Sequence, residues 1–429
     1  MKISEDKTIA KIAWRLLPLL MLGYFVAFVD RVNVGFASLS MNADIGISSA
    51  IFGFGAGLFY ITYVIFEIPS NLLLEKIGAR IWIGRIMISW GIISACGMFI
   101  SGEKSFYAIR LLLGVAEAGF FPGIILYITY WFPPKYRAKI IAIFMVAIPL
   151  SSFVGSPISA YILTLDGLWG LKDWQLLFLL EGLPAVILGI LVIMFLPNKP
   201  SDANWLCDEE KQYITTKTIP SPGESKKSSI NLKNFFNKRI LALSLAYAGA
   251  SGASQCLSIW QPVIIKSLGF QSLATGFLNA LPFGIACVMM ILWGRHSDLK
   301  NERIWHSKIS LFLVMFFLIV IAFVFEYALL VILSLIIAVS ATYMFKGPFW
   351  ALGGEYLPAG LVAFGLAEVN SIGNLAGFIG SWLIGIIRDW SGSFTYALIP
   401  IALISLAGCI VLHFIGKHQN LSSIKPHSR

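Results

Sequence analysis

Twelve long apolar segments run along this 429-residue chain, and they constrain its fold more than any other feature. A bilayer's hydrocarbon core, about 30 Å thick, needs roughly 20 apolar residues per helix, and only closed structures such as helices satisfy the backbone amides inside lipid. The sequence therefore predicts an all-α, polytopic membrane protein with twelve transmembrane helices. They are expected at about 14–36, 51–74, 81–100, 106–131, 140–163, 174–196, 239–265, 274–296, 308–326, 327–354, 361–387 and 394–416.

The composition argues against a soluble domain or a nucleic-acid partner. Apolar residues make up 58% of the chain and charged residues 13%, whereas about a quarter of a soluble domain is charged. The net charge is +10, but the Lys and Arg residues lie in short stretches between apolar segments and do not line one face. The five cysteines show no paired spacing, so we expect no disulfide, no metal and no cofactor.

One long polar stretch divides the chain into two halves. It runs from about Pro197 to Lys238 and is rich in Pro, Ser and Lys, which predicts a solvated linker with a short surface helix near 204–216. Motifs at 71–80 and 131–133 recur at 294–300 and 356–358, at offsets of 223 to 225 residues. The sequence therefore predicts two pseudo-symmetric six-helix bundles, 1–196 and 239–429, joined by a cytoplasmic linker, 197–238.

The distribution of basic residues predicts the orientation in the membrane. If both termini and the linker share one side, that side holds 25 of the 32 Lys and Arg residues, and the other side holds four. By the positive-inside rule the first side is cytoplasmic, although the loop from Glu355 to Leu361 carries no basic residue and gives no support. The remaining three basic residues, Arg31, Arg110 and Lys346, fall inside spans.

Ionisable side chains inside a span need a partner, a wet cavity or a function, because burying one costs about 3 kcal/mol or more. Asp30 and Arg31 point about 100° apart, so we expect Arg31 to face a central cavity and Asp30 a neighbouring helix. The alternative is a structural ion pair near the membrane surface. Arg110 and Glu117 share a helix face about 10 Å apart, too far for a direct salt bridge, and we expect both to face the same cavity.

These groups also predict the chemistry. Burial favours the protonated form of a carboxyl group, so Asp30 and Glu117 are candidate proton carriers, with purely structural pairing as the alternative. The guanidinium groups of Arg31 and Arg110 stay charged and can hold a carboxylate with two hydrogen bonds. An organic anion is therefore the expected substrate.

Other polar positions in the spans are less specific. Tyr60, Tyr63 and Glu67 form one stripe, which is either a cavity wall or aromatic packing. Lys346 either binds an anion or snorkels to the interface, and the Gly-Pro pair after it is expected to break the helix. Glu181 is expected to be structural. One face of the eleventh span carries amides and small residues that either bind a hydroxylated substrate or join helices: Asn370, Asn374, Gly377 and Ser381.

Three segments resemble the anion:cation symporter family of the major facilitator superfamily. They are Phe28–Ala37 (FVDRVNVGFA), Pro69–Arg80 and Arg110–Gly123, and the resemblance extends over nearly the whole chain. Residues 165–182 are especially similar to the family's bacterial 4-hydroxyphenylacetate permeases, and other members transport sugar acids and tartrate. The resemblance implies the major facilitator fold and proton-coupled uptake of a carboxylate.

The resemblance also implies roles for single residues. Asp30 and Glu117 match the family's protonated carboxylates. Its cytoplasmic gating loops correspond here to Glu75, Arg80 and Asp298, where Glu75 is expected to pair with cytoplasmic basic residues. Arg31 and Arg110 match the family's anion-binding and coupling arginines, and Tyr63, Trp350 and Asn370 match its substrate contacts. Lys346 and Asn374 are candidates from the residues alone. The predicted substrate-binding set is therefore Arg31, Arg110, Tyr63, Lys346, Trp350, Asn370 and Asn374.

The predicted function is proton-coupled uptake of a small organic carboxylate by alternating access, performed by a monomer in the bacterial inner membrane. Its partners would be the anion, protons and the lipid bilayer. An anion exchanger or a uniporter without proton coupling is the alternative. A membrane-embedded enzyme or sensor is disfavoured, because no span carries an HExxH, GxSxG or paired catalytic Asp motif and no signalling domain is appended.

Overall fold

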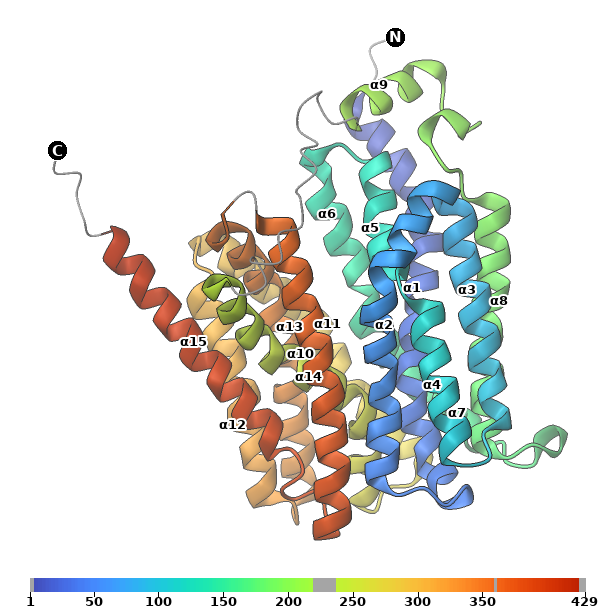
Figure 1. The fold of residues 1–429 in the computed structure, drawn as a ribbon, viewed down its shortest axis with the longest axis vertical. Helices are drawn as coiled ribbons and strands as arrows, with labels where there is room; N and C mark the ends of the chain where they lie inside the picture. The colour runs from blue at the N-terminus through green and yellow to red at the C-terminus, as the bar shows by residue number, and fades with distance from the viewer. Residues whose placement is uncertain (1–3, 219–236, 359–360, 424–429) are drawn as a thin grey trace.

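The computed structural model describes residues 4–218, 237–358 and 361–423, and its regular structure within these ranges is helical. Twelve helical spans there are long and apolar enough to cross a membrane, as the sequence predicts. Figure 1 shows them as two bundles side by side. The N-terminal lobe contains α1 (Glu5–Asp44), α2 (Ser49–Ile77), α3 (Ala79–Ala95), α4 (Glu103–Glu117), α5 (Phe120–Trp131), α6 (Pro134–Met145), α7 (Ala147–Ile162) and α8 (Asp173–Phe195).

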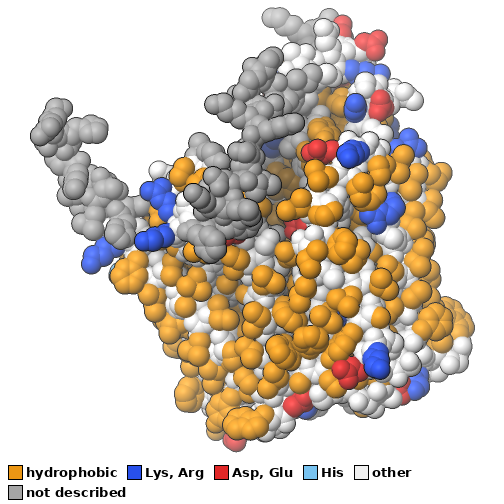
Figure 2. All heavy atoms as spheres, viewed as in Figure 1, with side chains coloured by type: hydrophobic (Ala, Val, Ile, Leu, Met, Phe, Trp, Pro, Cys, Tyr) orange, Lys and Arg blue, Asp and Glu red, His pale blue; other side chains and the backbone are white. Residues whose placement is uncertain are grey.

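The C-terminal lobe repeats the arrangement with six helices. They are α10 (Lys238–Ser267), α11 (Ser272–Lys300), α12 (Ile304–Val324), α13 (Ala328–Tyr356), α14 (Val362–Ser391) and α15 (Ile399–Ser423). Large apolar side chains stand exposed on the outer faces, among them Phe66, Phe195 and Phe323. Figure 2 shows this apolar surface between two ends where charged side chains gather. Such a surface is suited to lipid and not to water.

Two breaks occur where the sequence predicts single spans. The span at 106–131 is interrupted between α4 and α5, where Gly119 has a φ of +84°. Glu117 is therefore the last residue of α4, next to the break. The span at 140–163 is divided into α6 and α7 at Val146, without a left-handed residue.

The expectation that Gly347-Pro348 breaks its helix is wrong. α13 continues from Ala328 to Tyr356 with Pro348 in its interior. A proline removes only one backbone hydrogen bond, and membrane helices tolerate this loss where neighbouring helices surround them. Pro348 and Phe349 are both buried.

The lobes meet closely at the far end of the molecule, opposite the termini end where α1 begins and α15 ends. Added Cβ atoms at Gly35 and Gly53 would collide with the backbone carbonyls of Ile259 and Ser381 in the other lobe, so glycine allows these close approaches. The Asp389 carboxylate of α14 accepts the first N–H groups of α2, from Ser49 at 3.0 Å and Ala50 at 2.7 Å. On the opposite side, the Asn279 amide of α11 donates to the Ser156 hydroxyl of α7 at 2.8 Å. These contacts seal the far end.

The first part of the linker packs on the N-terminal lobe. α9 (Asp208–Thr218) occupies nearly the residues expected for the surface helix, and residues 219–236 lie outside the described ranges. Ile214 is buried, and Lys11 pairs with Glu210 at 2.8 Å. Partial burial acts to raise the pKa of the Glu210 carboxyl. The hydrogen bonds from Lys11 and the Cys207 N–H outweigh burial, so this pKa lies below its ordinary value.

Candidate functional site

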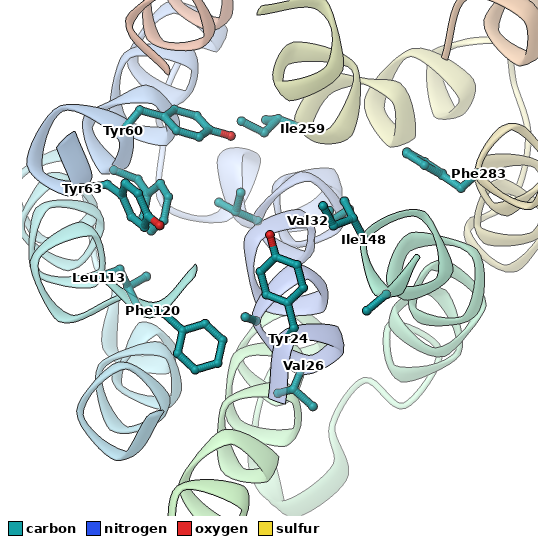
Figure 3. Close-up of a cluster of buried hydrophobic side chains, with 14 of the residues drawn as sticks. Tyr24, Val26, Val32, Tyr60, Tyr63, Leu113, Phe120, Ile148, Ile259 and Phe283 are labelled. Atoms are coloured by element: carbon teal, nitrogen blue, oxygen red, sulfur yellow. The ribbon is translucent and has the colours of Figure 1, made fainter. Parts of the chain in front are cut away.

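A cavity of about 700 Å³ lies between the two lobes. Its walls extend from the middle of the molecule toward the termini end, because the lining residues of α13 and α14 lie in the halves nearer that end. Figure 3 shows the tyrosines of its N-terminal wall, with Tyr60 pointing toward Ile259 of the other lobe. The polar lining side chains are Tyr24, Arg31, Tyr60, Tyr63 and Glu67 from one lobe and Tyr247, Ser251, Ser254, Gln255, Ser258, Tyr343, Lys346, Asn370 and Asn374 from the other.

Arg31 is the cation of the N-terminal wall. Its guanidinium group faces the cavity and binds one oxygen of Glu117 through two nitrogens, with Nη2 at 2.5 Å and Nε at 2.7 Å. The rings of Phe28, Phe59 and Tyr63 surround it, with centroids 4.8 to 5.2 Å from its central carbon. Glu117 is 1% exposed and lies behind Arg31, outside the cavity lining. Arg31 therefore lies between the cavity and the buried Glu117 carboxylate.

Asp30 points away from the cavity, toward α3. Its carboxylate accepts hydrogen bonds from the Ser94 hydroxyl and, at 3.2 Å, from the Asn33 amide. This is the direction that helical spacing predicts when Arg31 takes the cavity side. Asp30 is 3% exposed. The expectation that Asp30 faces a neighbouring helix while Arg31 faces the cavity agrees with these contacts.

Arg110 also lies outside the cavity, contrary to the prediction. It is 4% exposed, and its Nη2 donates to the Ala56 carbonyl at 3.1 Å while its Nε has no hydrogen-bond partner among the described atoms. The cause is the packing of α4 on α2. A Cβ at Gly114 would collide with Thr62 and with the Phe59 carbonyl, so the helices touch here and α2 separates this face of α4 from the cavity.

The C-terminal wall has a different chemistry. The Lys346 ammonium lies 4.2 Å from the Tyr343 ring centroid and forms no ion pair within the described part of the chain. Trp350 packs on Tyr247, with ring centroids 4.9 Å apart. The predicted residues Asn370 and Asn374 both line the cavity. This wall therefore offers one unneutralised cation among amides, hydroxyls and aromatic rings.

Sequence reasoning left the role of α10 in this wall unspecified. The Gln255 amide nitrogen donates to Asn374 at 2.9 Å and to Ser251 at 3.1 Å, and its oxygen is buried without a partner among the described atoms. Ser251, Gln255 and Ser258 recur at intervals of four and three residues. This polar stripe at helical spacing was the available signal.

The candidate gating residues are engaged within their own lobes. The Arg80 guanidinium donates to the Ile193 carbonyl, and the Arg80 backbone N–H donates to Asn198 at 2.9 Å. Asp298 pairs with Arg303 at 2.5 Å. Glu75 is exposed and forms no ion pair with any described residue, so its expected pairing with basic residues is absent from this conformation. At this end, no ion pair among the described residues joins the two lobes.

A twelve-helix fold with a central cavity between two six-helix lobes defines a membrane transporter and not an enzyme. The model of the Major Facilitator Superfamily matches residues 20–381, and the chain belongs to this family. A "Putative tartrate transporter" of Agrobacterium vitis is 45% identical over 96% of this chain and 92% of its own length. The "Putative metabolite transport protein NicT" of Pseudomonas putida is 39% identical over 94% and 92%. These relatives are consistent with the anion:cation symporter type.

Solved structures share the fold at low sequence identity. A bacterial homolog of the human lysosomal transporter Spinster, described as inward-facing and unoccupied, has a TM-score of 0.71 at 17% identity and covers 96% of both chains. The inward-open xylose transporter XylE of E. coli has a TM-score of 0.72 at 16% identity, covering 94% of this chain and 96% of its own. The major facilitator fold is confirmed.

Proposed function

We propose that this protein is a secondary active transporter that takes up a small organic carboxylate together with protons. The observation that carries the proposal is the Arg31–Glu117 pair in the cavity wall, opposite Lys346, which has no ion-pair partner among the described residues. An anion that enters the cavity meets Lys346, which has no ion-pair partner among the described residues, and Arg31, which is already paired with Glu117.

The pair provides a physical basis for proton coupling. While Glu117 is ionised, it competes with a substrate carboxylate for Arg31. Protonation of Glu117 removes its charge, so the guanidinium group becomes available to the substrate. Proton and anion binding then favour each other, and a coupling of this kind is reciprocal. The proton gradient biases transport because protonation changes the relative affinity of the two conformations.

The substrate class follows from both walls. Arg31 and Lys346 on opposite lobes suit an anion with two negative groups, and the amides of Gln255, Asn370 and Asn374 suit hydroxyl groups. A hydroxylated dicarboxylate such as tartrate fits this pattern, which agrees with the names of the A. vitis relatives. Aromatic rings also line the cavity, so aromatic acids and sugar acids remain candidate substrates.

The orientation follows from charge. The cavity extends toward the termini end, where the positive-inside rule predicts the cytoplasm, so this conformation is inward-facing. Bundles 1–196 and 239–429 would rock about the substrate, with the seal at the far end opening and the termini end closing. The protein would act as a monomer in the bacterial inner membrane.

The test is uptake into proteoliposomes of labelled tartrate, a sugar acid and a hydroxyphenylacetate, under an imposed pH gradient. Symport predicts accumulation of at least one anion, and a proton ionophore should abolish it. Accumulation that is indifferent to the ionophore but requires a trans anion would establish the exchanger instead. Equilibration without accumulation would establish a uniporter.

A further inference from the structure

A second carboxylate is buried in the N-terminal lobe, away from the cavity. Glu181 of α8 is 5% exposed, and its Oε1 accepts a hydrogen bond from the Ser159 hydroxyl of α7 at 2.6 Å. Its Oε2 is buried and has no hydrogen-bond partner among the described atoms. An ionised oxygen without a donor in this position would be costly, whereas a protonated one carries no charge.

Glu181 forms no ion pair with any described residue. The charge of Asp30 on α1 acts on Glu181, and the buried Asn33 amide donates to Asp30 at 3.2 Å. The adjoining helices α3 and α7 contribute the neutral hydroxyls of Ser94 and Ser159. The charges of Glu117 and Arg110 also act on Asp30. When both are ionised, Asp30 and Glu181 are therefore like charges that destabilise each other in the lobe interior.

Among the described residues of the N-terminal lobe, the buried charged side chains and Arg31 balance only when one proton is bound. Arg31 and Arg110 supply two fixed positive charges, and the buried acids Asp30, Glu117 and Glu181 supply three negative charges when all are ionised. Since Arg31 is committed to Glu117, the excess negative charge belongs to the Asp30–Glu181 pair.

We infer that Glu181 is a proton-binding residue and that Asp30 and Glu181 hold one proton between them. The sequence alone favours a structural role for Glu181, but its unpartnered oxygen and its acidic neighbour point to a titrating one. This inference deepens the proposed function and rests on its proton coupling. It adds a proton site, remote from the substrate, to the one at Glu117.

Infrared spectroscopy of the purified protein tests the protonation directly. A protonated buried carboxyl group has a carbonyl stretch distinct from the carboxylate bands, and this stretch moves in D₂O. We expect it in the wild type and expect Glu181→Gln to lose the intensity of one carboxyl group, with thermal unfolding confirming that the variant is folded. Glu67→Gln, which changes a cavity-wall carboxylate, is the matched control and should keep that intensity. A spectrum unchanged by Glu181→Gln would overturn the inference.

Transport provides an independent measurement. Glu181→Gln should reduce uptake driven by a pH gradient about tenfold, equivalent to ~1.4 kcal/mol, while counterflow of labelled against unlabelled substrate, which needs no net proton movement, should stay unchanged. A merely structural residue would lower both activities together, and that result would also reject the inference. Wild-type uptake that ignores an ionophore would refute symport itself, and the infrared result would still decide whether Glu181 is protonated.

Discussion

The two walls of the cavity come from lobes with the same arrangement of helices, but they present different kinds of side chain. In the N-terminal wall the cation Arg31 is already paired with Glu117, and further acids are buried behind it. The C-terminal wall is built from amides, hydroxyls and aromatic rings around Lys346, a single cation without an ion-pair partner in the described residues. Under the proposed function, one lobe would respond to protons and the other would recognise the substrate.

This division has an energetic basis. A paired, buried charge cannot bind a new anion without losing its partner, so the N-terminal wall would bind an anion only when Glu117 releases Arg31. A cation without an ion-pair partner binds whenever the anion is present, so the C-terminal wall sets basal affinity. Variants of the first wall should therefore alter coupling, and variants of the second should alter affinity.

The largest effect is expected from Arg31→Ala. It removes a cation that binds the substrate and leaves Glu117 buried without its partner. Breaking a buried ion pair in this way costs about 3 to 5 kcal/mol. Uptake should fall by more than about 100-fold, the equivalent of ~3 kcal/mol. The measurement is initial uptake in proteoliposomes, with Arg85→Ala on α3, which does not line the cavity, as the control. Retention of uptake in Arg31→Ala would remove Arg31 from the site.

Glu117→Gln should separate coupling from binding. The neutral amide imitates the protonated acid, so Arg31 stays free for the substrate while no proton can be released. We expect accumulation driven by a pH gradient to disappear and counterflow to persist at about the wild-type rate. Loss of both activities would mean that Glu117 only holds Arg31 in place, and the N-terminal wall would not be the proton-responsive one.

The fold was predictable from the sequence because lipid imposes simple requirements. Span length and apolar content locate all twelve helices, and the 100° step between neighbours correctly separates the directions of Asp30 and Arg31. The site was less predictable. Arg110 appears equivalent to Arg31 in the sequence, yet the contact of Gly114 with α2 removes it from the cavity.

Long-range pairing was equally hidden. Arg31 and Glu117 are 86 residues apart, and nothing in either span shows that they meet. The break at Gly119, which makes Glu117 the last residue of α4, depends on a left-handed glycine inside an apolar segment that reads as continuous. Such features depend on which helices touch, and hydropathy gives no information about that.

Lys346→Met tests the second wall. It retains the length and apolar stem of the side chain but removes the charge, so substrate affinity should fall about tenfold, or ~1.4 kcal/mol. Thermal-shift titration of the purified protein with the transported anion measures this, and Lys346→Arg should preserve most of the affinity. Proton coupling of the remaining uptake should be unchanged. A variant that binds normally but accumulates nothing would reverse the assignment of the two walls.

The smallest effect is expected from Gln255→Ala. This change removes the amide that donates to Asn374 and Ser251 and whose buried oxygen has no partner among the described atoms. A hydrogen bond of about 1 kcal/mol to a substrate hydroxyl predicts about a fivefold loss of affinity for a hydroxylated anion. A matched anion lacking the hydroxyl should bind to Gln255→Ala and to the wild type equally. Titrating both anions against both proteins gives the coupling free energy between the Gln255 amide and the substrate hydroxyl directly. Equal losses for the two anions would show that Gln255 only positions α14, and the C-terminal wall would then recognise charge without reading hydroxyl groups.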